Sequence, residues 1–145
     1  MEDLNKIVEK VEKYKTVTNR LLQHMRKIEE VIRQAMITID ILRFEVPGTG
    51  IVVAQGYDGY PVFRVYKHDE LIDKGYIPYD VKHVGGEGYW GGNFNRPFTY
   101  LGREGIFTVA RNIRKTLETL LIIVDKSEKT AEELAEKLEA IAKVL

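Results

Sequence analysis

Residues 4–42 read LNKIVEKVEKYKTVTNRLLQHMRKIEEVIRQAMITIDIL, and apolar side chains recur throughout this stretch every three or four positions. With Leu4 at heptad position a, eleven of the twelve a and d positions are apolar or aromatic. This period predicts one amphipathic helix, about 60 Å long at 1.5 Å per residue. Further apolar residues at positions e and g favour a coiled coil or, better, a helical bundle. We expect this helix over 2–45, ended by Pro47 and Gly48.

The carboxyl-terminal third repeats the pattern. With Ala110 at position a, only Ser127 among the twelve a and d positions is polar. Thr130 and Glu133 have the spacing of a capping box, so 105–145 forms either one helix or two helices broken near 126–130. The run TLLIIV at 119–124 also fits a buried strand, but the heptad phase continues on both sides of it. We therefore favour a helix there.

A strand-rich region lies between the two helical stretches, over 50–102. The apolar runs 51–55 and 60–66 flank an Asp-Gly pair, which predicts a hairpin with a type I′ turn and places Pro61 on an edge strand. Residues 77–84 and 99–102 are further candidate strands. The predicted fold class is α+β, with long N-terminal and C-terminal amphipathic helices flanking a small antiparallel β region in a single domain, 1–145.

Composition narrows the possible partners. The 145 residues include 22 basic and 22 acidic side chains, which argues against a chain-wide electrostatic partner. The absence of cysteine excludes disulfides, thiolate zinc sites and cysteine nucleophiles. No apolar run approaches the roughly 18 residues needed to span a bilayer, so we expect a soluble, cytoplasmic protein without a membrane partner. Abundant Lys and Glu match the tendency of thermophilic proteins.

The segment VGGEGYWGGNFNRPF at 84–98 combines five glycines with flat apolar rings and one guanidinium group. Such rings suit a protein partner, a stacked base or a sugar, although most aromatic side chains pack in cores. The alternative is that they cap the sheet or the end of a helix. The candidate partner-binding residues are Tyr89, Trp90, Phe94, Arg96 and Phe98.

A basic run follows, with one acidic residue, Glu104, inside it. The helix amino terminus predicted near LGREG exposes backbone donors that attract anions, and neighbouring arginines would strengthen a phosphate contact. An ordinary solvated helix face is the alternative. The candidate anion-binding or nucleic-acid-binding residues are Arg96, Arg103, Arg111, Arg114 and Lys115.

Asp58 at the hairpin turn and the Asp80-Val81-Lys82 segment stand 22 residues apart. This outline is similar to that of the PD-(D/E)XK nucleases, and the resemblance implies that Asp58 and Asp80 hold Mg²⁺ beside Lys82. Tyrosine precedes Asp58 where the family has proline, and the element order fits only if 119–124 is a strand. A turn aspartate with a solvent-facing strand pair is the alternative. The three histidines are isolated, and their spacing indicates no zinc site.

Two terminal helices joined by a β region also resemble prefoldin in outline, where paired helices emerge from hairpins that assemble subunits. We therefore expect a non-enzymatic assembly or protein-interaction module, without a cofactor, that forms a homo-oligomer and contacts a protein partner through the segment 84–98. A nucleic-acid-binding protein and a metal-dependent nuclease are the alternatives.

Overall fold

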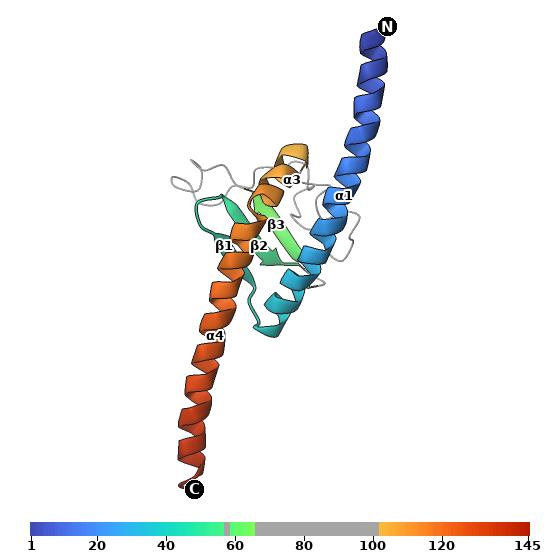
Figure 1. The fold of residues 1–145 in the computed structure, drawn as a ribbon. Coiled ribbons are helices and arrows are strands. Elements are labelled where there is room, and N and C mark those ends of the chain that lie inside the picture. Colours follow the sequence, from blue (N-terminus) through green and yellow to red (C-terminus); the bar gives the residue numbers. More distant parts are fainter. Residues whose placement is uncertain (57–58, 66–101) are drawn as a thin grey trace.

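The computed structural model describes residues 1–56, 59–65 and 102–145, with side chains described from 105 onward in the last segment. The elements run in the order α1 (Glu2–Thr38), β1 (Arg43–Val46), β2 (Ile51–Gln55), β3 (Pro61–Val65), α3 (Gly102–Arg111) and α4 (Ile113–Ala142). The α+β class is thereby confirmed, because long helices at both ends flank a small antiparallel sheet (Figure 1).

The three described strands form one antiparallel sheet in the order β1-β2-β3. Val53 lies at its centre, paired with Phe44 on one side and with Phe63 on the other. The hairpin predicted between 51–55 and 60–66 is present, and Gly59 has a positive φ of 89°. The Gly59 amide donates to the Gly56 carbonyl at 2.9 Å, so Gly59 is the last residue of the turn, whereas the predicted type I′ turn at Asp-Gly requires it to be one of the two central residues. Its proline, Pro61, lies on β3 at the edge of the described sheet, as predicted.

The amino-terminal helix is shorter than the predicted span 2–45. It ends at Thr38, Asp40 adopts a left-handed φ of 57°, and the Ile41 amide donates to the Met36 carbonyl at 3.0 Å. Residues 43–46 then form β1, a strand that the heptad pattern did not predict. Phe44 is buried while its neighbours are exposed, and this alternation is the period of a half-buried strand.

The carboxyl-terminal region contains two helices, but the interruption lies at Asn112 and not near 126–130. Thr130 does not cap a new helix, because its hydroxyl donates to the Lys126 carbonyl one turn earlier. Residues 119–124 are helical, which confirms the prediction of a helix there over a buried strand. Of the other candidate strands, 77–84 lies outside the described residues, and Gly102 begins α3 instead of ending a strand.

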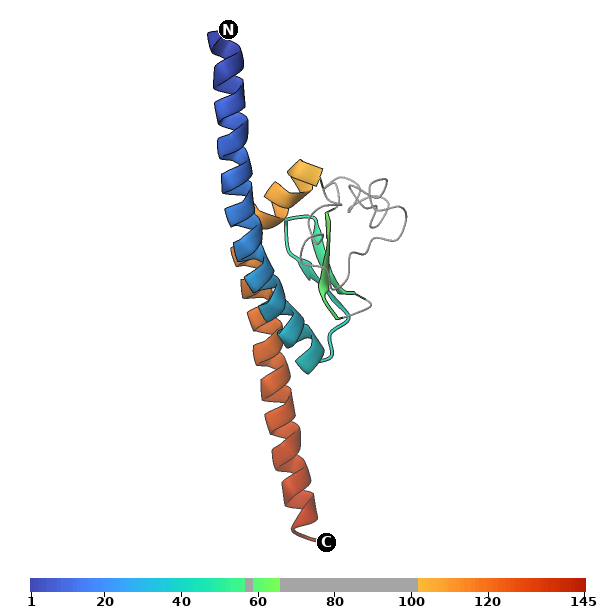
Figure 2. The same cartoon turned by 90° about the vertical axis from the view of Figure 1, so that its right-hand side faces the viewer.

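The core lies where the inner halves of α1 and α4 meet the sheet, with α3 alongside. Figure 2 shows the sheet on one side of the two long helices. Glu29 and Thr116 are buried with the apolar side chains. The buried apolar residues are Met25, Ile32, Met36, Phe44, Val46, Ile51, Val52, Val53, Val62, Phe63, Val65, Val109 and Leu120.

The two long helices run in the same direction but are displaced along their axes. Figure 1 places the amino terminus at one end of the molecule and the carboxyl terminus at the other. Each helix therefore contacts the core with one half and extends beyond it with the other. Within the described residues, neither helix is long and apolar enough to cross a membrane.

Candidate functional site

The outer half of α1 carries an exposed apolar stripe. All residues from 1 to 17, here called the α1 arm, are exposed. From Leu4 to Val17, the apolar side chains of this arm have 45–62% of their surface accessible, and they recur at the heptad spacing of one helix face. The α1 stripe consists of Leu4, Ile7, Val8, Val11, Tyr14 and Val17.

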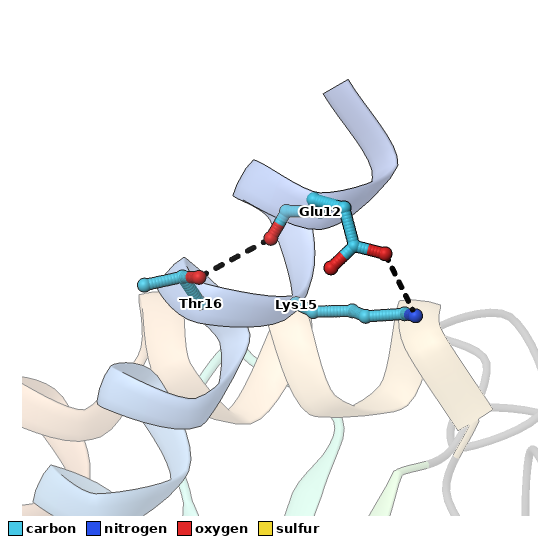
Figure 3. A network of polar contacts seen from close by, with 3 residues as sticks. All are labelled: Glu12, Lys15 and Thr16. Carbon is cyan, nitrogen blue, oxygen red and sulfur yellow. Dashed lines mark hydrogen bonds and ion pairs between the residues drawn. The ribbon is translucent and has the colours of Figure 1, made fainter. Parts of the chain in front are cut away.

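Polar contacts of Glu12 in this arm are local. The Lys15 ammonium lies 3.2 Å from the Glu12 carboxylate, and the Thr16 hydroxyl donates to the Glu12 carbonyl at 3.2 Å (Figure 3). Both groups of the ion pair are about two thirds exposed, so the pair adds little to stability. These contacts support the helix but connect the arm to no other element.

A shallow depression follows the α1 stripe, lined by Lys6, Ile7, Lys10, Val11 and Tyr14. Its apolar floor lies between side chains of successive helical turns, which is the kind of hole that receives a side chain from a second helix. The long lysine side chains at its border keep their ammonium groups in water while their methylene groups extend the apolar surface.

The outer half of α4 has the same character. All residues from 128 to 145, here called the α4 arm, are exposed. A shallow depression crosses its inner end, lined by Lys126, Ser127, Thr130, Ala131 and Leu134. At the inner end the Ser127 and Thr130 hydroxyls donate to helix carbonyls one turn earlier, so their polar groups are satisfied within α4. The α4 stripe consists of Leu134, Leu138 and Ile141 together with Val144 and Leu145, which follow the end of α4 at Ala142.

The inner halves of the same helices show how such a stripe is buried. Ile32 occupies heptad position a of α1, as Leu4 does, and it is 0% exposed against 57% for Leu4. On α4, Leu120 and Leu134 share position d, and only Leu120 is buried. The periodic pattern is therefore continuous along both helices, while the protein's own core covers only half of it.

The five candidate partner-binding residues, Tyr89, Trp90, Phe94, Arg96 and Phe98, lie outside the described residues. The same holds for Asp58, Asp80 and Lys82, the residues of the nuclease hypothesis. The strand at 119–124 on which that resemblance depended is a helix. Among the described residues, no group of three or more His, Asp or Glu side chains is placed to hold a metal ion.

Part of the basic run falls on described residues. Arg103 lies in the first turn of α3, which begins at Gly102 and so contains most of the LGREG segment. Arg111, Arg114 and Lys115 are exposed around the junction of α3 and α4. The Arg111 guanidinium lies 6.0 Å from the centre of the Phe107 ring. The junction therefore presents three cations to solvent.

Sequence reasoning identified the two apolar stripes but not the division of each stripe into a covered half and an exposed half. The exposed halves are thus the functional candidates that the pattern alone does not single out. Comparisons with protein-family models, with curated proteins and with solved structures found no match for this chain.

Proposed function

We propose that this protein is a non-enzymatic assembly module whose helix arms bury their apolar stripes against other protein chains, including copies of itself. The observation that carries the proposal is the exposure of both stripes on helices whose inner halves are packed. Scattered exposed apolar residues are ordinary on protein surfaces, but contiguous apolar patches mark interaction sites. Here the exposed residues are aligned on one face for about four helical turns on the α1 arm and about three on the α4 arm.

Helix formation gives the α1 arm little independent stability. Its exposed face includes Val8, Val11 and Val17, and β-branched residues lose side-chain freedom in a helix. Isolated helical segments of about this length are marginal in water, and most helical stability in proteins comes from packing. A partner that covers the stripe would therefore stabilise the arm as well as bind it.

The free energy gained by burying the stripes exceeds the cost of association by only a small amount, so each contact should be weak. Complete burial of a Val, Leu or Ile side chain contributes about 1.5–3 kcal/mol, so covering one that is half exposed contributes about 1 kcal/mol. Pairing two stripes of five or six such residues thus gives about 10 kcal/mol, against an association cost of about 4–15 kcal/mol. The most favourable balance, about 6 kcal/mol, corresponds to a dissociation constant of roughly tens of micromolar for each contact, and a higher association cost makes the contact weaker.

Sedimentation velocity over protein concentrations from about 1 µM to about 500 µM tests the proposal. The wild-type mass should rise with concentration. A variant with Ile7→Gln, Val11→Gln, Leu134→Gln and Leu138→Gln should remain monomeric, because glutamine keeps helix propensity but removes the apolar surface. Glu9→Gln with Glu136→Gln, on the opposite helix faces, is the matched control and should assemble like the wild type.

The proposal fails if the wild type stays monomeric throughout this range and the immobilised protein retains no partner from a cell extract. A mass that rises equally in the wild type and in the four-substitution variant would show instead that assembly uses another surface.

A second candidate function, nucleic-acid binding, is supported by the exposure of Arg111, Arg114 and Lys115 around one helix junction. Contacts of this kind weaken steeply with salt because they release counterions. A mobility shift at low salt that disappears in Arg111→Gln/Arg114→Gln/Lys115→Gln would support this function. No shift by the wild type, even at low salt, would exclude it.

A further inference from the structure

We propose that the α1 arm of one copy pairs with the α4 arm of a second copy, in the same direction, so that the chains assemble head to tail. This inference rests on the proposed function and names the partner of each arm. It follows from three properties of the arms: their lengths, their directions and the charges beside their stripes.

The two arms match in length. The exposed segments 1–17 and 128–145 contain 17 and 18 residues. Aligning Leu4 with Ala131 brings the a and d positions of the arms into the same layers. Ile7 then meets Leu134, Val11 meets Leu138 and Tyr14 meets Ile141, so three successive layers pair exposed apolar side chains of the two stripes.

The directions of the arms agree with this pairing. Both helices run the same way along the molecule, and their arms extend from opposite ends (Figures 1 and 2). A second copy displaced along this axis brings its α1 arm beside the α4 arm of the first copy, with both helices still running the same way.

The flanks of the stripes carry unlike charges. On the α1 arm, the side of the stripe next to Ile7 and Tyr14, heptad positions g and c, has a net side-chain charge of +2. Its charged residues are Asp3, Lys6, Lys10 and Lys13. The other side, positions e and b, is neutral because Glu12 offsets Lys15.

On the α4 arm the acidic side is the opposite one. The side next to Ala131 and Leu138, positions e and b, has a net charge of −3 from Glu128, Glu132 and Glu139 and contains no base. The side next to Leu134 and Ile141, positions g and c, is neutral because Glu133 offsets Lys137.

Helix direction decides which sides meet. In a parallel pair, the g side of one helix faces the e side of the other, whereas in an antiparallel pair like sides face each other. A parallel α1–α4 pair therefore sets +2 against −3 and neutral against neutral. A parallel pair of two α1 arms or of two α4 arms sets a charged side against a neutral one, and their antiparallel pairs set like charges together. An antiparallel α1–α4 pair again sets each charged side against a neutral one.

Two variants that each block one arm test the inference. The first carries Ile7→Gln/Val11→Gln, and the second carries Leu134→Gln/Leu138→Gln. In head-to-tail assembly each variant alone should be monomeric at the highest concentration. An equimolar mixture should form a 1:1 heterodimer, because each variant supplies the arm that the other lacks. Circular dichroism of each variant should match that of the wild type, since all four side chains are exposed.

The outcomes separate this inference from the proposed function. A wild type that never associates would overturn both. Variants that each still dimerise, with no heterodimer in the mixture, would show pairing of like arms and overturn this inference while the assembly function stands. A mixture that stays monomeric would overturn it as well.

Cysteine cross-linking then tests the direction of pairing, since the chain has no cysteine of its own. A mixture of Leu4→Cys and Ala131→Cys chains should form a disulfide under mild oxidation, because parallel pairing sets these positions in one layer. A mixture of Leu4→Cys and Ile141→Cys chains is the matched control, because parallel pairing separates these positions by ten residues, about 15 Å along the helix. Preferential cross-linking of the control pair would indicate antiparallel arms and would overturn the inference.

Discussion

The substitutions Ile32→Ala and Leu4→Ala should have very different effects on folding stability, although both residues occupy position a of the same helix. Ile32 is 0% exposed and belongs to the main apolar cluster. Its truncation removes buried methyl groups and leaves a cavity, which should lower the free energy of unfolding by about 2–5 kcal/mol. Leu4 is 57% exposed, so Leu4→Ala loses less than half of the transfer free energy and opens no cavity. Its cost should be below about 1 kcal/mol.

Urea unfolding followed by far-ultraviolet circular dichroism measures both effects. The measurement belongs at about 2 µM protein, where association contributes little to the apparent stability. At higher concentration, Leu4→Ala should lose more stability relative to the wild type, because the wild type gains from assembly. Equal destabilisation by the two substitutions at 2 µM would refute the division of α1 into a packed half and an exposed arm.

Three further outcomes are expected. Gly59→Ala should lower the free energy of unfolding by about 1–3 kcal/mol, because Gly59 has a φ of +89° and an added Cβ would lie 2.9 Å from Ile37 Cδ1; an unchanged urea midpoint would contradict this. Thr130→Ala should change that free energy by less than about 0.5 kcal/mol, since the hydroxyl bonds within a continuous helix, whereas loss of a true cap would cost about 1 kcal/mol. Glu132→Lys/Glu139→Lys should weaken self-association in sedimentation velocity several-fold more than Glu136→Lys, its control on the opposite face of the α4 arm; equal effects would refute the role assigned to the acidic flank.

The sequence predicts the α+β architecture because its strongest signals are long and periodic. The heptad pattern of α1 continues for about four turns beyond anything the core covers, so it indicates the helix whether or not the stripe is buried. The Asp-Gly pair likewise predicts the hairpin, because glycine readily adopts the positive φ found at Gly59.

The predicted helix ends are wrong where the heptad pattern continues past the actual end of a helix. Ile39 and Leu42 continue the heptad of α1, so the pattern carries the predicted helix past its actual end at Thr38. Phe44 and Val46 alternate with polar residues over only four positions, which is too short to distinguish a strand from a helix by period alone. The break at Asn112 is hidden for the same reason, since Ala110 and Ile113 keep the heptad phase across it.

The sequence predicts which residues form the two stripes of the candidate site, but not which part of each stripe is exposed. The pattern shows which residues share a helix face, and it therefore identifies both stripes. Whether the sheet covers a given turn of that face depends on where β1, β2 and β3 lie along the helix, and this is a property of the tertiary structure. Heptad position a is thus occupied by Ile32 in the core and by Leu4 in solvent.

The displacement of α1 and α4 along a common direction has a mechanical consequence. A pulling force applied between the two termini draws the helices past each other along their shared length (Figure 2). The packing between them and the sheet is then loaded in shear, so that contacts along the whole overlap resist together instead of opening one after another. A load applied between the termini would therefore act on the overlap of α1, α4 and the sheet, and not on the arms alone.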